Sequence, residues 1–533
     1  MLITIPLMRG EIPRLKPHLL PNEAAVIAKD CCFENGIIRP LCNDAVVASL
    51  PLSAKTIFKY TDEHWFLWDK PIEAIHNPMA QDEWQRVYFT GENKPKVTAQ
   101  DIAIGVVSPA ASYNLGVPIP SSAPVINRID SSTGSDPEAG QAAIFDDETR
   151  YYIQTFVTRF GEESAPSKPS TELLVEKPGS TIYIGLARLN VNTHNITHTR
   201  LYRTVTSSVS AEYMLVAELP IAQAEYIDST ATLNAPILET WQYDVPDENM
   251  RGLCVMANGI CAGFAGNEVM FSEAFLPYAW PKQYRGTTEH QIVGITAIGT
   301  SLVVVTKGYP YIFSGVTPSA INGTKIDSEQ ACVSNKSMVV VNGTVIYASP
   351  DGLVAIGSDG AITITDQLMT RRQWQTKQPH TIKAWASEGM YIALYSGGGF
   401  IFDPVSQDFR ELSNRWDCAY EDLERDQLVV VQGSEMRLWQ GGDNYLSGQW
   451  RSKVFLLPVD SLMSCARVVS TKVNQLSLKI FGDGKLLYSL NEGEIPHNGF
   501  RLPAIRATTW QIEVSGRAEV ERLMMASSMQ ELM

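Results

Sequence analysis

Short apolar runs separated by tight-turn residues constrain this chain more than any other feature of its sequence. Between Met250 and Leu446 units of strand, turn and strand recur, with the turns A-N-G, V-N-G and S-E-G between successive strands. Such runs, bounded by Gly, Asn and Asp, are typical of β-hairpins. Their spacing of roughly 40 to 50 residues is that of propeller blades. The sequence therefore predicts a β-propeller in this part of the chain.

Two earlier hairpins belong to the same predicted propeller. They run from Lys55 to Asp69, with T-D-E-H as the turn, and from Trp84 to Thr98, with T-G-E-N as the turn. Their aromatic and β-branched residues suit half-buried pleated surfaces. A closed ring of six or seven blades that pairs early strands with late ones would protect most sheet edges.

A different composition separates these hairpins from the later units. From Val106 to Gly140 the chain is rich in Pro, Ser, Gly and Ala, which predicts an extended linker. Several strands with short turns follow over 141–245, where an immunoglobulin-like or fibronectin-III-like sandwich is the economical interpretation. The sandwich would therefore interrupt the propeller.

The predicted fold class is all-β: a β-propeller interrupted by an immunoglobulin/fibronectin-III-like sandwich, with a small C-terminal β-domain. In that last domain G-D-G makes a tight hairpin turn within S-L-K-I-F-G-D-G-K-L-L-Y-S-L. A short helical stretch is predicted near Glu23 to Lys29. The predicted parts are an N-terminal arm (1–30), the first part of the propeller (31–105), the linker (106–140), the sandwich (141–245), the remainder of the propeller (246–446) and the C-terminal β-domain (447–533).

Charge and composition oppose several classes of function. The formal net charge of -15 opposes attraction to phosphate backbones, although an acidic wall could line a conduit through which DNA passes without adhering. No stretch reaches about 18 uninterrupted apolar residues, and no secretion signal is recognisable, so neither a membrane anchor nor export is expected. The cysteines form no C-x-x-C pair and are expected to be free thiols: Cys31, Cys32, Cys42, Cys254, Cys261, Cys332, Cys418 and Cys465.

Signatures of catalysis and cofactor binding are missing from the sequence. It contains no phosphate-binding G-x-x-x-x-G-K-[ST], no H-E-x-x-H and no G-x-S-x-G, so we expect no enzyme, no cofactor and no metal. His194 and His198 could hold a metal on a helix, but their surroundings predict a loop. The turn S-P-D-G-L from Ser349 lacks a full sialidase Asp-box. Loop carboxylates are expected at two acidic clusters: Asp146, Asp147 and Glu148, and Glu421, Asp422, Glu424 and Asp426.

Two aromatic clusters are the remaining candidates for a binding surface. Trp65, Phe66 and Trp68 alternate along a predicted strand, which favours core packing with Trp65 on the opposite face from the other two. The segment F-L-P-Y-A-W-P-K-Q-Y is more suggestive, because its prolines oppose regular strand pairing and its aromatics are dense. We predict that it forms a contact between subunits, or alternatively between domains, through Phe275, Tyr278, Trp280 and Tyr284.

Several segments together resemble a known family. These are Y-Y-I-Q-T-F-V-T-R-F-G-E-E-S-A-P-S-K-P-S with the later R-L-Y-R-T and A-E-Y-I-D-S, then N-G-I-C-A-G-F-A-G-N-E-V-M-F-S-E-A-F-L-P-Y-A-W-P, and Y-A-S-P-D-G-L-V-A-I. They resemble bacteriophage virion proteins, with the tail nozzle or tail-tube hub of short-tailed phages as the nearest functional analogy. The opening from Gly10 to Leu41 is similar to the start of such proteins.

The resemblance implies a structural, non-enzymatic subunit of a phage tail that is assembled in the host cytoplasm. It implies a homo-oligomer, commonly a hexamer, that continues the DNA-ejection channel and contacts portal, adaptor or other tail proteins. DNA would pass transiently without specific binding. Two alternatives stay open: a receptor- or glycan-binding tail module that uses loops rich in Trp and Tyr, and a propeller glycosidase or lyase.

Overall fold

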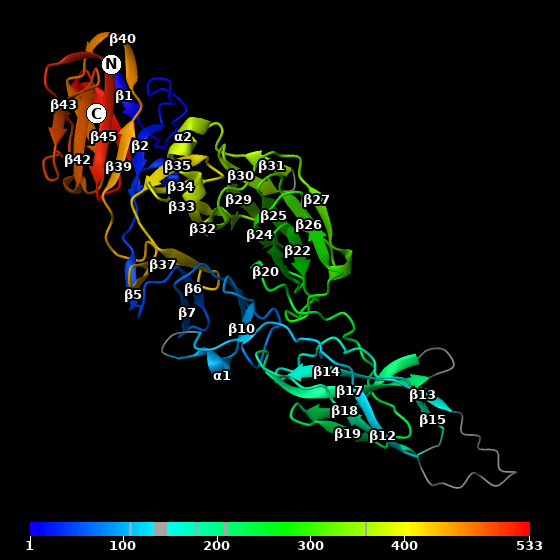
Figure 1. Cartoon of the computed structure of the whole chain (residues 1–533). Helices are drawn as coiled ribbons and strands as arrows, with labels where there is room; N and C mark the ends of the chain where they lie inside the picture. Colours follow the sequence, from blue (N-terminus) through cyan, green and yellow to red (C-terminus); the bar gives the residue numbers. More distant parts are fainter. Residues whose placement is uncertain (106–108, 132–146, 177–178, 207–210, 358–359, 533) are drawn as a thin grey trace.

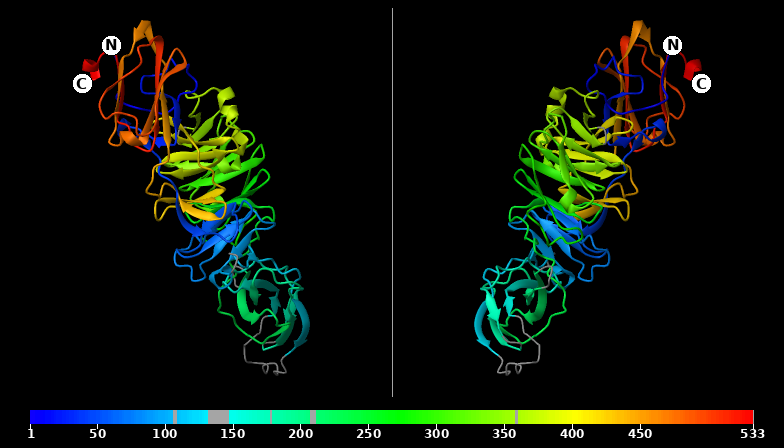
Figure 2. Two further views of the ribbon diagram at one scale, coloured as in Figure 1. Left: turned by 90° about the vertical axis from the view of Figure 1, so that its left-hand side faces the viewer. Right: turned by 90° about the vertical axis from the view of Figure 1, so that its right-hand side faces the viewer.

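The chain is nearly all β and has three parts that follow one another in space (Figure 1). The computed structural model describes residues 1–105, 109–131, 147–176, 179–206, 211–357 and 360–532. A propeller occupies the middle of an elongated molecule, a sandwich lies at one end, and a domain containing both termini lies at the other (Figure 2). This confirms the predicted fold class.

The propeller consists of six antiparallel four-stranded sheets and one two-stranded sheet. Its first two complete sheets are β8 (Glu73–His76), β9 (Val87–Thr90), β10 (Lys96–Thr98) and β11 (Tyr113–Asn114), and β20 (Arg251–Val255), β21 (Cys261–Ala265), β22 (Glu268–Phe271) and β23 (Arg285–Thr287). The next two are β24 (Ile292–Ile298), β25 (Ser301–Thr306), β26 (Tyr311–Ser314) and β27 (Asn322–Lys325), and β28 (Val339–Val341), β29 (Thr344–Ala348), β30 (Leu353–Gly357) and β31 (Gly360–Thr363).

The remaining sheets close the ring. They are β32 (Lys383–Ser387), β33 (Met390–Tyr395), β34 (Gly398–Asp403) and β35 (Asp408–Leu412); β36 (Cys418–Asp422), β37 (Gln427–Gln432) and β38 (Glu435–Leu438) with β5 (Ala45–Ser49); and the two-stranded sheet β6 (Thr56–Lys59) and β7 (Trp65–Trp68). The early strand β5 pairs with the late strand β38. The predicted closure by pairing of early and late strands is therefore confirmed.

The innermost strands contact one another around the ring. β8 packs on β20, and the order continues through β24, β28, β32 and β36 to β6. A shared apolar cluster that contains Phe58, Phe66 and Phe89 joins the two-stranded sheet to the sheet of β8. The hairpin turns follow the expected chemistry: Asn342 and Gly343, between β28 and β29, both adopt positive φ, as a type I′ turn requires.

The sandwich is inserted between β11 and β20. One sheet consists of β12 (Val125–Asp130), β16 (Thr181–Gly185) and β19 (Glu225–Asp228), and the other of β14 (Tyr152–Thr158), β17 (Ile196–Thr206) and β18 (Ala211–Pro220), with a ribbon of β13 (Glu148–Arg150) and β15 (Leu173–Val175). Tyr152, Ile182 and Leu201 are among the residues that pack between the sheets. Buried Asp228 accepts hydrogen bonds from the Tyr152 hydroxyl at 2.7 Å and from Arg203 Nη1 at 2.8 Å.

The segment predicted as a linker contains structure at both of its ends. β11 completes a propeller sheet by pairing Lys96 with Asn114, and β12 pairs with β16 in the sandwich. The prediction of an extended connection over 106–140 was therefore wrong for these two strands. Their Pro-rich and Ser-rich flanks do not indicate strands, because the hydrogen bonds come from β10 across an intervening loop and from the distant strand β16.

The C-terminal domain consists of two packed sheets and includes the N-terminus. One sheet contains β2 (Ala25–Lys29), β39 (Gly448–Ser452), β40 (Phe455–Leu462), β42 (Leu476–Gly482), β43 (Lys485–Leu490) and β45 (Arg506–Gly516), and the other β1 (Leu2–Ile5), β41 (Cys465–Val469), β44 (Phe500–Arg501) and β46 (Arg522–Ala526). Buried Trp450, Leu478 and Trp510 lie in the core between them. The predicted G-D-G hairpin joins β42 to β43.

Two predictions about the first thirty residues were wrong. They do not form a separate arm, because β1 pairs with β46 and buries Ile3 and Ile5 in the C-terminal core. The predicted helix near Glu23 to Lys29 is strand β2. Its Ala and Glu favour a helix locally, but pairing with β39 overrides this weak preference.

The strand β2 also joins two domains. It pairs antiparallel with β39 and, through Lys29 and Glu411, parallel with β35 of the propeller. One continuous sheet therefore runs from the propeller into the C-terminal domain. A short ribbon, β3 (Cys31–Cys32) with β4 (Arg39–Pro40), follows it.

Helices are few and short. The described residues contain two α-helices, α1 (Gln100–Ala103) and α2 (Arg371–Thr376). The 3₁₀ turns are Glu34–Gly36, Pro318–Ala320, Asn335–Ser337, Pro379–Thr381, Val473–Gln475 and Met529–Leu532. None of the described helices has the length and apolar character needed to cross a membrane.

A buried carboxyl group lies against β2. Glu11 Oε1 accepts a hydrogen bond from the Ala28 backbone N–H at 2.7 Å. Burial is the largest influence on this group and, with neighbouring Glu411, raises the pKa of Glu11 from 4.5 to about 8. The folded chain therefore binds a proton that the unfolded chain releases between these two values. The stability that Glu11 contributes is lost as the pH rises through this range.

Replacing Glu11 with glutamine is expected to remove this pH dependence. Gln keeps a carbonyl acceptor for the Ala28 N–H and carries no charge. The stability of Glu11→Gln relative to the wild type should therefore increase by about 4 kcal/mol between about pH 5 and about pH 9. Urea unfolding of both proteins at the two pH values measures this difference. A difference that does not change with pH would contradict the expectation.

Candidate functional site

The predicted aromatic contact segment divides into an exposed part and a buried part. Phe275 is 46% exposed and adopts positive φ in the turn that follows β22. Tyr284 is half-buried, and its hydroxyl donates a hydrogen bond to Glu273 Oε1 at 2.9 Å. Of the predicted contact residues, Phe275 is thus the one that presents a large apolar side chain to solvent.

Tyr278 and Trp280 are buried inside the chain. Trp280 is 1% exposed, and its Nε1–H donates to the Pro277 carbonyl at 2.7 Å. Both aromatic residues belong to an apolar cluster that includes Phe156 and Ile196 of the sandwich. Both side chains therefore pack between domains, as the alternative prediction had it, and are not free for a contact between subunits. The prolines that prevent strand pairing allow this segment to fold under the sandwich.

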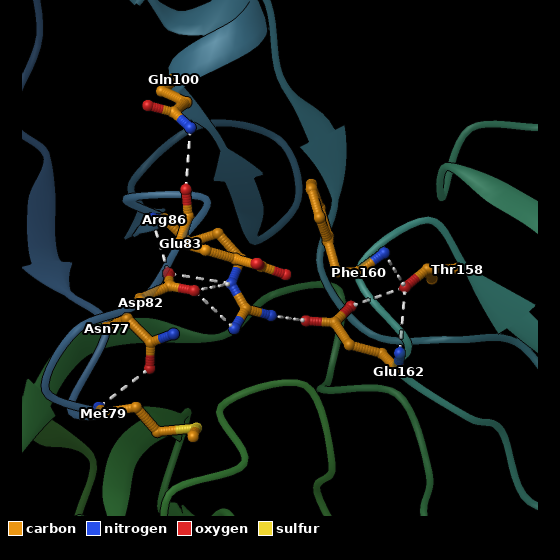
Figure 3. A network of polar contacts seen from close by, with 9 residues as sticks. All are labelled: Asn77, Met79, Asp82, Glu83, Arg86, Gln100, Thr158, Phe160 and Glu162. Atoms are coloured by element: carbon orange, nitrogen blue, oxygen red, sulfur yellow. Dashed lines mark hydrogen bonds and ion pairs between the residues drawn. The ribbon is translucent and has the colours of Figure 1, made fainter.

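A buried charged network joins the propeller to the sandwich (Figure 3). Arg86, next to β9, donates from Nη1 to Glu162 Oε1 of the sandwich at 2.8 Å and from Nη2 to Asp82 Oδ1 at 3.0 Å. The side chains of Arg86, Asp82 and Glu162 are only 11%, 8% and 6% exposed. The hydroxyl of Thr158 also donates to Glu162, at 3.4 Å. One guanidinium group therefore bridges two carboxylates from two domains.

The surroundings of this network act differently on its two carboxylates. Burial is the dominant influence on Glu162 and raises its pKa to about 7, although Arg86 opposes the change. Burial also acts to raise the pKa of Asp82. Hydrogen bonds from the side chain and the backbone N–H of Arg86 outweigh that effect, so the pKa of Asp82 is lowered overall. Above about pH 7 both carboxylates are ionised and depend on Arg86 for their compensation.

Aromatic and cationic side chains surround the network on its exposed side. Trp84 meets Phe160 edge to face, with ring centroids 5.3 Å apart. The Arg159 guanidinium lies 4.8 Å from the Trp84 ring centroid and donates to Asp101 Oδ2 at 2.7 Å. Contacts of this kind add specificity of orientation to a domain interface. The sandwich is therefore held to the propeller by paired charges as well as by apolar packing.

The second acidic cluster has a structural role at the end of a propeller strand. Lys59 Nζ lies 3.0 Å from Asp422 Oδ2, 3.0 Å from Glu424 Oε2 and 3.1 Å from Asp62 Oδ1. Hydrogen bonds to these carboxylates, led by Asp422, raise the pKa of Lys59. The cluster thus ties β6 to β36 where the early and late parts of the chain meet.

The other predicted polar residues do not converge. His194 Nδ1 lies 2.9 Å from the Gly116 carbonyl oxygen, and His198 Nδ1 lies 2.9 Å from Thr197 Oγ1. Glu148 pairs with Arg150. Asp146 lies outside the described residues. Among the residues that are described, no three His, Cys, Asp or Glu side chains are grouped as a metal site would require.

The outer edge of β5 is a surface that sequence reasoning missed. β5 is the last strand of its sheet, so no described strand pairs with its outer edge. Val46 and Val47 are 55% and 56% exposed. The outer strands β23 and β27 carry Arg285 and Lys325, whereas β5, like the shorter outer strands β11 and β31, has no charged residue. The signal was present in the charge-free run A-V-V-A-S-L, which could have been recognised as an unprotected strand.

An apolar groove lies beside β5. It has a volume of about 460 Å³ and passes between the sheet of β5 and the two-stranded sheet. Val47, Trp65, Leu67 and Met436 are among the residues that line it. Trp65 faces this groove side, while Phe66 and Trp68 pack in a different cluster, as the alternation along the strand predicted. The short two-stranded sheet leaves this groove uncovered.

Comparison with known proteins assigns no family. No family model matches the chain, and no curated protein matches it. Among solved structures it is similar to the AfRom2 CNH domain, at 8% identity and a TM-score of 0.26 over 58% of this chain and 93% of that chain. It is also similar to Hsv2 of Kluyvelomyces marxianus, at 11% identity and a TM-score of 0.24 over 58% and 94% of the two chains.

A third similar structure is PorZ, a surface component of the type-IX secretion system of Porphyromonas gingivalis. The identity is 10% and the TM-score 0.25, over 82% of this chain and 78% of that chain. TM-scores of this size carry no argument about function. The architecture of this chain therefore rests on its own sheets and contacts, and its function has to be argued from its surfaces.

Proposed function

We propose that this chain is a non-enzymatic structural subunit of a bacteriophage tail, which assembles with identical copies into a nozzle or hub that continues the DNA-ejection channel. The open edge of β5 is the observation that carries the self-assembly part of this proposal. The resemblance of the sequence to tail nozzle proteins supports the assignment of the chain to a phage tail. Portal, adaptor or other tail proteins are the expected neighbours in the virion.

The edge of β5 supports assembly for a physical reason. An exposed strand edge without charged residues presents unpaired N–H and C=O groups that pair readily with another chain. Val46 and Val47 add exposed apolar area, and the groove lined by Trp65 and Leu67 adjoins them. A second copy that covers this region would satisfy the backbone groups and bury the valines.

The junctions between the domains support a mechanical role in a tube wall. The sheet that passes through β2 connects the propeller to the C-terminal domain, and the Arg86 network connects the propeller to the sandwich. Two kinds of junction, one of strands and one of buried charges, oppose bending of the elongated molecule. A tube wall requires such rigidity in each of its subunits.

The acidic composition supports passage of DNA without adhesion. The net charge of -15 repels phosphates over about one Debye length, ~8 Å at physiological salt. Cryo-electron microscopy of virions that contain the chain tests this part of the proposal. The chain should surround the DNA conduit, and a position away from the conduit would refute the channel role.

Substitution of Val47 with lysine is expected to prevent self-assembly. A charge on the open edge of β5 repels its copy and costs desolvation on pairing. The wild type should have a mass that is a multiple of 58.9 kDa by light scattering, and Val47→Lys should have the mass of one chain. Val405→Lys, at a valine that is 81% exposed in the turn between β34 and β35, is the matched control and should assemble normally.

A further inference from the structure

The seven innermost propeller strands begin at the same mouth of the central channel. Two cavities there, of about 520 and 790 Å³, share the lining residues Pro71, Glu73, Lys336 and Ala384. The first is lined by the beginnings of β6, β8, β32 and β36, and the second by the beginnings of β8, β20 and β24 and by the turn that precedes β28. The two cavities therefore lie next to each other at one mouth of the ring.

Cationic side chains from four different sheets meet at this mouth. They come from the beginnings of β6, β20, β28 and β32, and we call them together the basic mouth: Lys55, Arg251, Lys336 and Lys383. None of them forms an ion pair with a described carboxylate. Lys383 Nζ donates to the Asp417 backbone carbonyl at 3.1 Å. A group of four cations without ion pairs to described carboxylates is unusual in a chain whose net charge is -15.

The two carboxylates that line the same cavities already have other partners. Asp417 Oδ2 accepts from the Gly433 N–H at 2.8 Å, and Glu73 Oε2 accepts from the Thr90 hydroxyl at 3.3 Å. At the other ends of β6 and β36 carboxylates outnumber the lysine, because Lys59 is surrounded by three acidic side chains. At those ends the cationic side chain of Lys59 is thus compensated by carboxylates, in contrast to the four cations of the basic mouth.

The wall of the smaller cavity is largely apolar. Phe58, Leu253 and Trp385 line the smaller cavity together with the lysines. Cavities of this size, with apolar walls and a few charged groups, are typical of ligand sites. A fitting ligand has negative charges that reach the lysines and apolar groups that contact the wall.

We propose that the basic mouth binds a short acidic peptide segment, with apolar side chains, from a partner protein. Lysines on flexible stems suit separate carboxylates, whereas phosphate recognition favours the rigid fork of arginine, and three of the four cations are lysines. A long polyanion such as DNA would be repelled by the acidic remainder of the surface. This inference goes beyond the proposed self-assembly and holds for the single chain as well as for a ring.

A fluorescence anisotropy titration of the full chain tests this proposal. The probe is a fluorescein-labelled hexapeptide, Glu-Leu-Glu-Glu-Leu-Glu, and a peptide with Gln in place of Glu is its control. The acidic peptide should bind, and its affinity should fall by at least about tenfold between low salt and about 0.5 M salt. The Gln peptide should bind at least about tenfold more weakly. Equal binding of the two peptides would overturn the proposal, as would no binding of the acidic one.

Variants locate the binding at the basic mouth. The double variant Lys336→Glu, Lys383→Glu should bind the acidic peptide at least about tenfold more weakly than the wild type. Lys168→Glu reverses the charge of one exposed lysine in the sandwich and should bind within about twofold of the wild type. Wild-type affinity in the double variant would refute the site.

Two further measurements complete the test. Lys336→Met, Lys383→Met removes the charges without reversing them, and it should show weakened binding at an unchanged unfolding temperature. Inorganic phosphate should compete with the peptide only as a general salt does. If phosphate displaced the peptide far more strongly than chloride at the same ionic strength, the mouth would be a phosphate site, and the peptide proposal would be overturned.

Discussion

Substitution of Arg86 with methionine should destabilise the junction between propeller and sandwich by about 3–5 kcal/mol at about pH 8. Methionine keeps much of the buried volume but removes the charge that compensates Asp82 and Glu162. Asp82 would then be a buried carboxylate without this cation, and Glu162 would bind a proton because Arg86 no longer opposes the rise of its pKa. Hydrogen exchange of the backbone amides from Thr158 to Glu163 measures the free energy of local opening there.

A triple variant separates loss of charge balance from loss of packing. Adding Asp82→Asn and Glu162→Gln to Arg86→Met removes the uncompensated charges, and should recover a large part of the lost stability because it leaves only neutral groups at the junction. A decrease below about 1 kcal/mol for Arg86→Met alone would mean that the network contributes little and that apolar packing holds the sandwich.

Trp280→Ala is expected to reduce the free energy of unfolding by about 3–5 kcal/mol, because it empties a fully buried site in the cluster between the domains. Its Nε1–H bond to the Pro277 carbonyl is lost as well. Phe275→Ala, in the same segment but on the surface, should cost less than about 1 kcal/mol. Urea unfolding followed by tryptophan fluorescence compares the two variants.

The oligomeric mass of the same variants distinguishes the two interpretations of this segment. A domain contact predicts that Trp280→Ala acts on stability and leaves the mass of folded protein unchanged. If Trp280→Ala left stability unchanged and reduced the mass to that of one chain, the segment would be a subunit contact after all.

The propeller could be predicted because its blades are local hairpins. The turn at Asn342 and Gly343 and the hairpin from Lys55 to Asp69 are each decided by neighbouring residues, so the sequence alone indicates them. The strands β2 and β11 could not be predicted from their local composition. Each is a strand because it forms hydrogen bonds with a partner strand, β39 for β2 and β10 for β11.

The functional surfaces were harder to predict than the fold. Arg86 and Glu162 are separated by 76 positions and belong to two domains, so no motif connects them. The cations of the basic mouth are scattered between Lys55 and Lys383 and meet only because each lies where an innermost strand begins. The edge of β5 was visible as a charge-free apolar run, but its position at the rim of a closed ring was not.

The most direct test of the proposed function is single-particle cryo-electron microscopy of the purified full chain at a concentration at which it assembles. The account predicts a closed ring of identical subunits in which the outer edge of β5, with Val46 and Val47, is buried at each contact between subunits. Separate molecules with β5 open to solvent, or an assembly whose contacts leave this edge exposed, would contradict it.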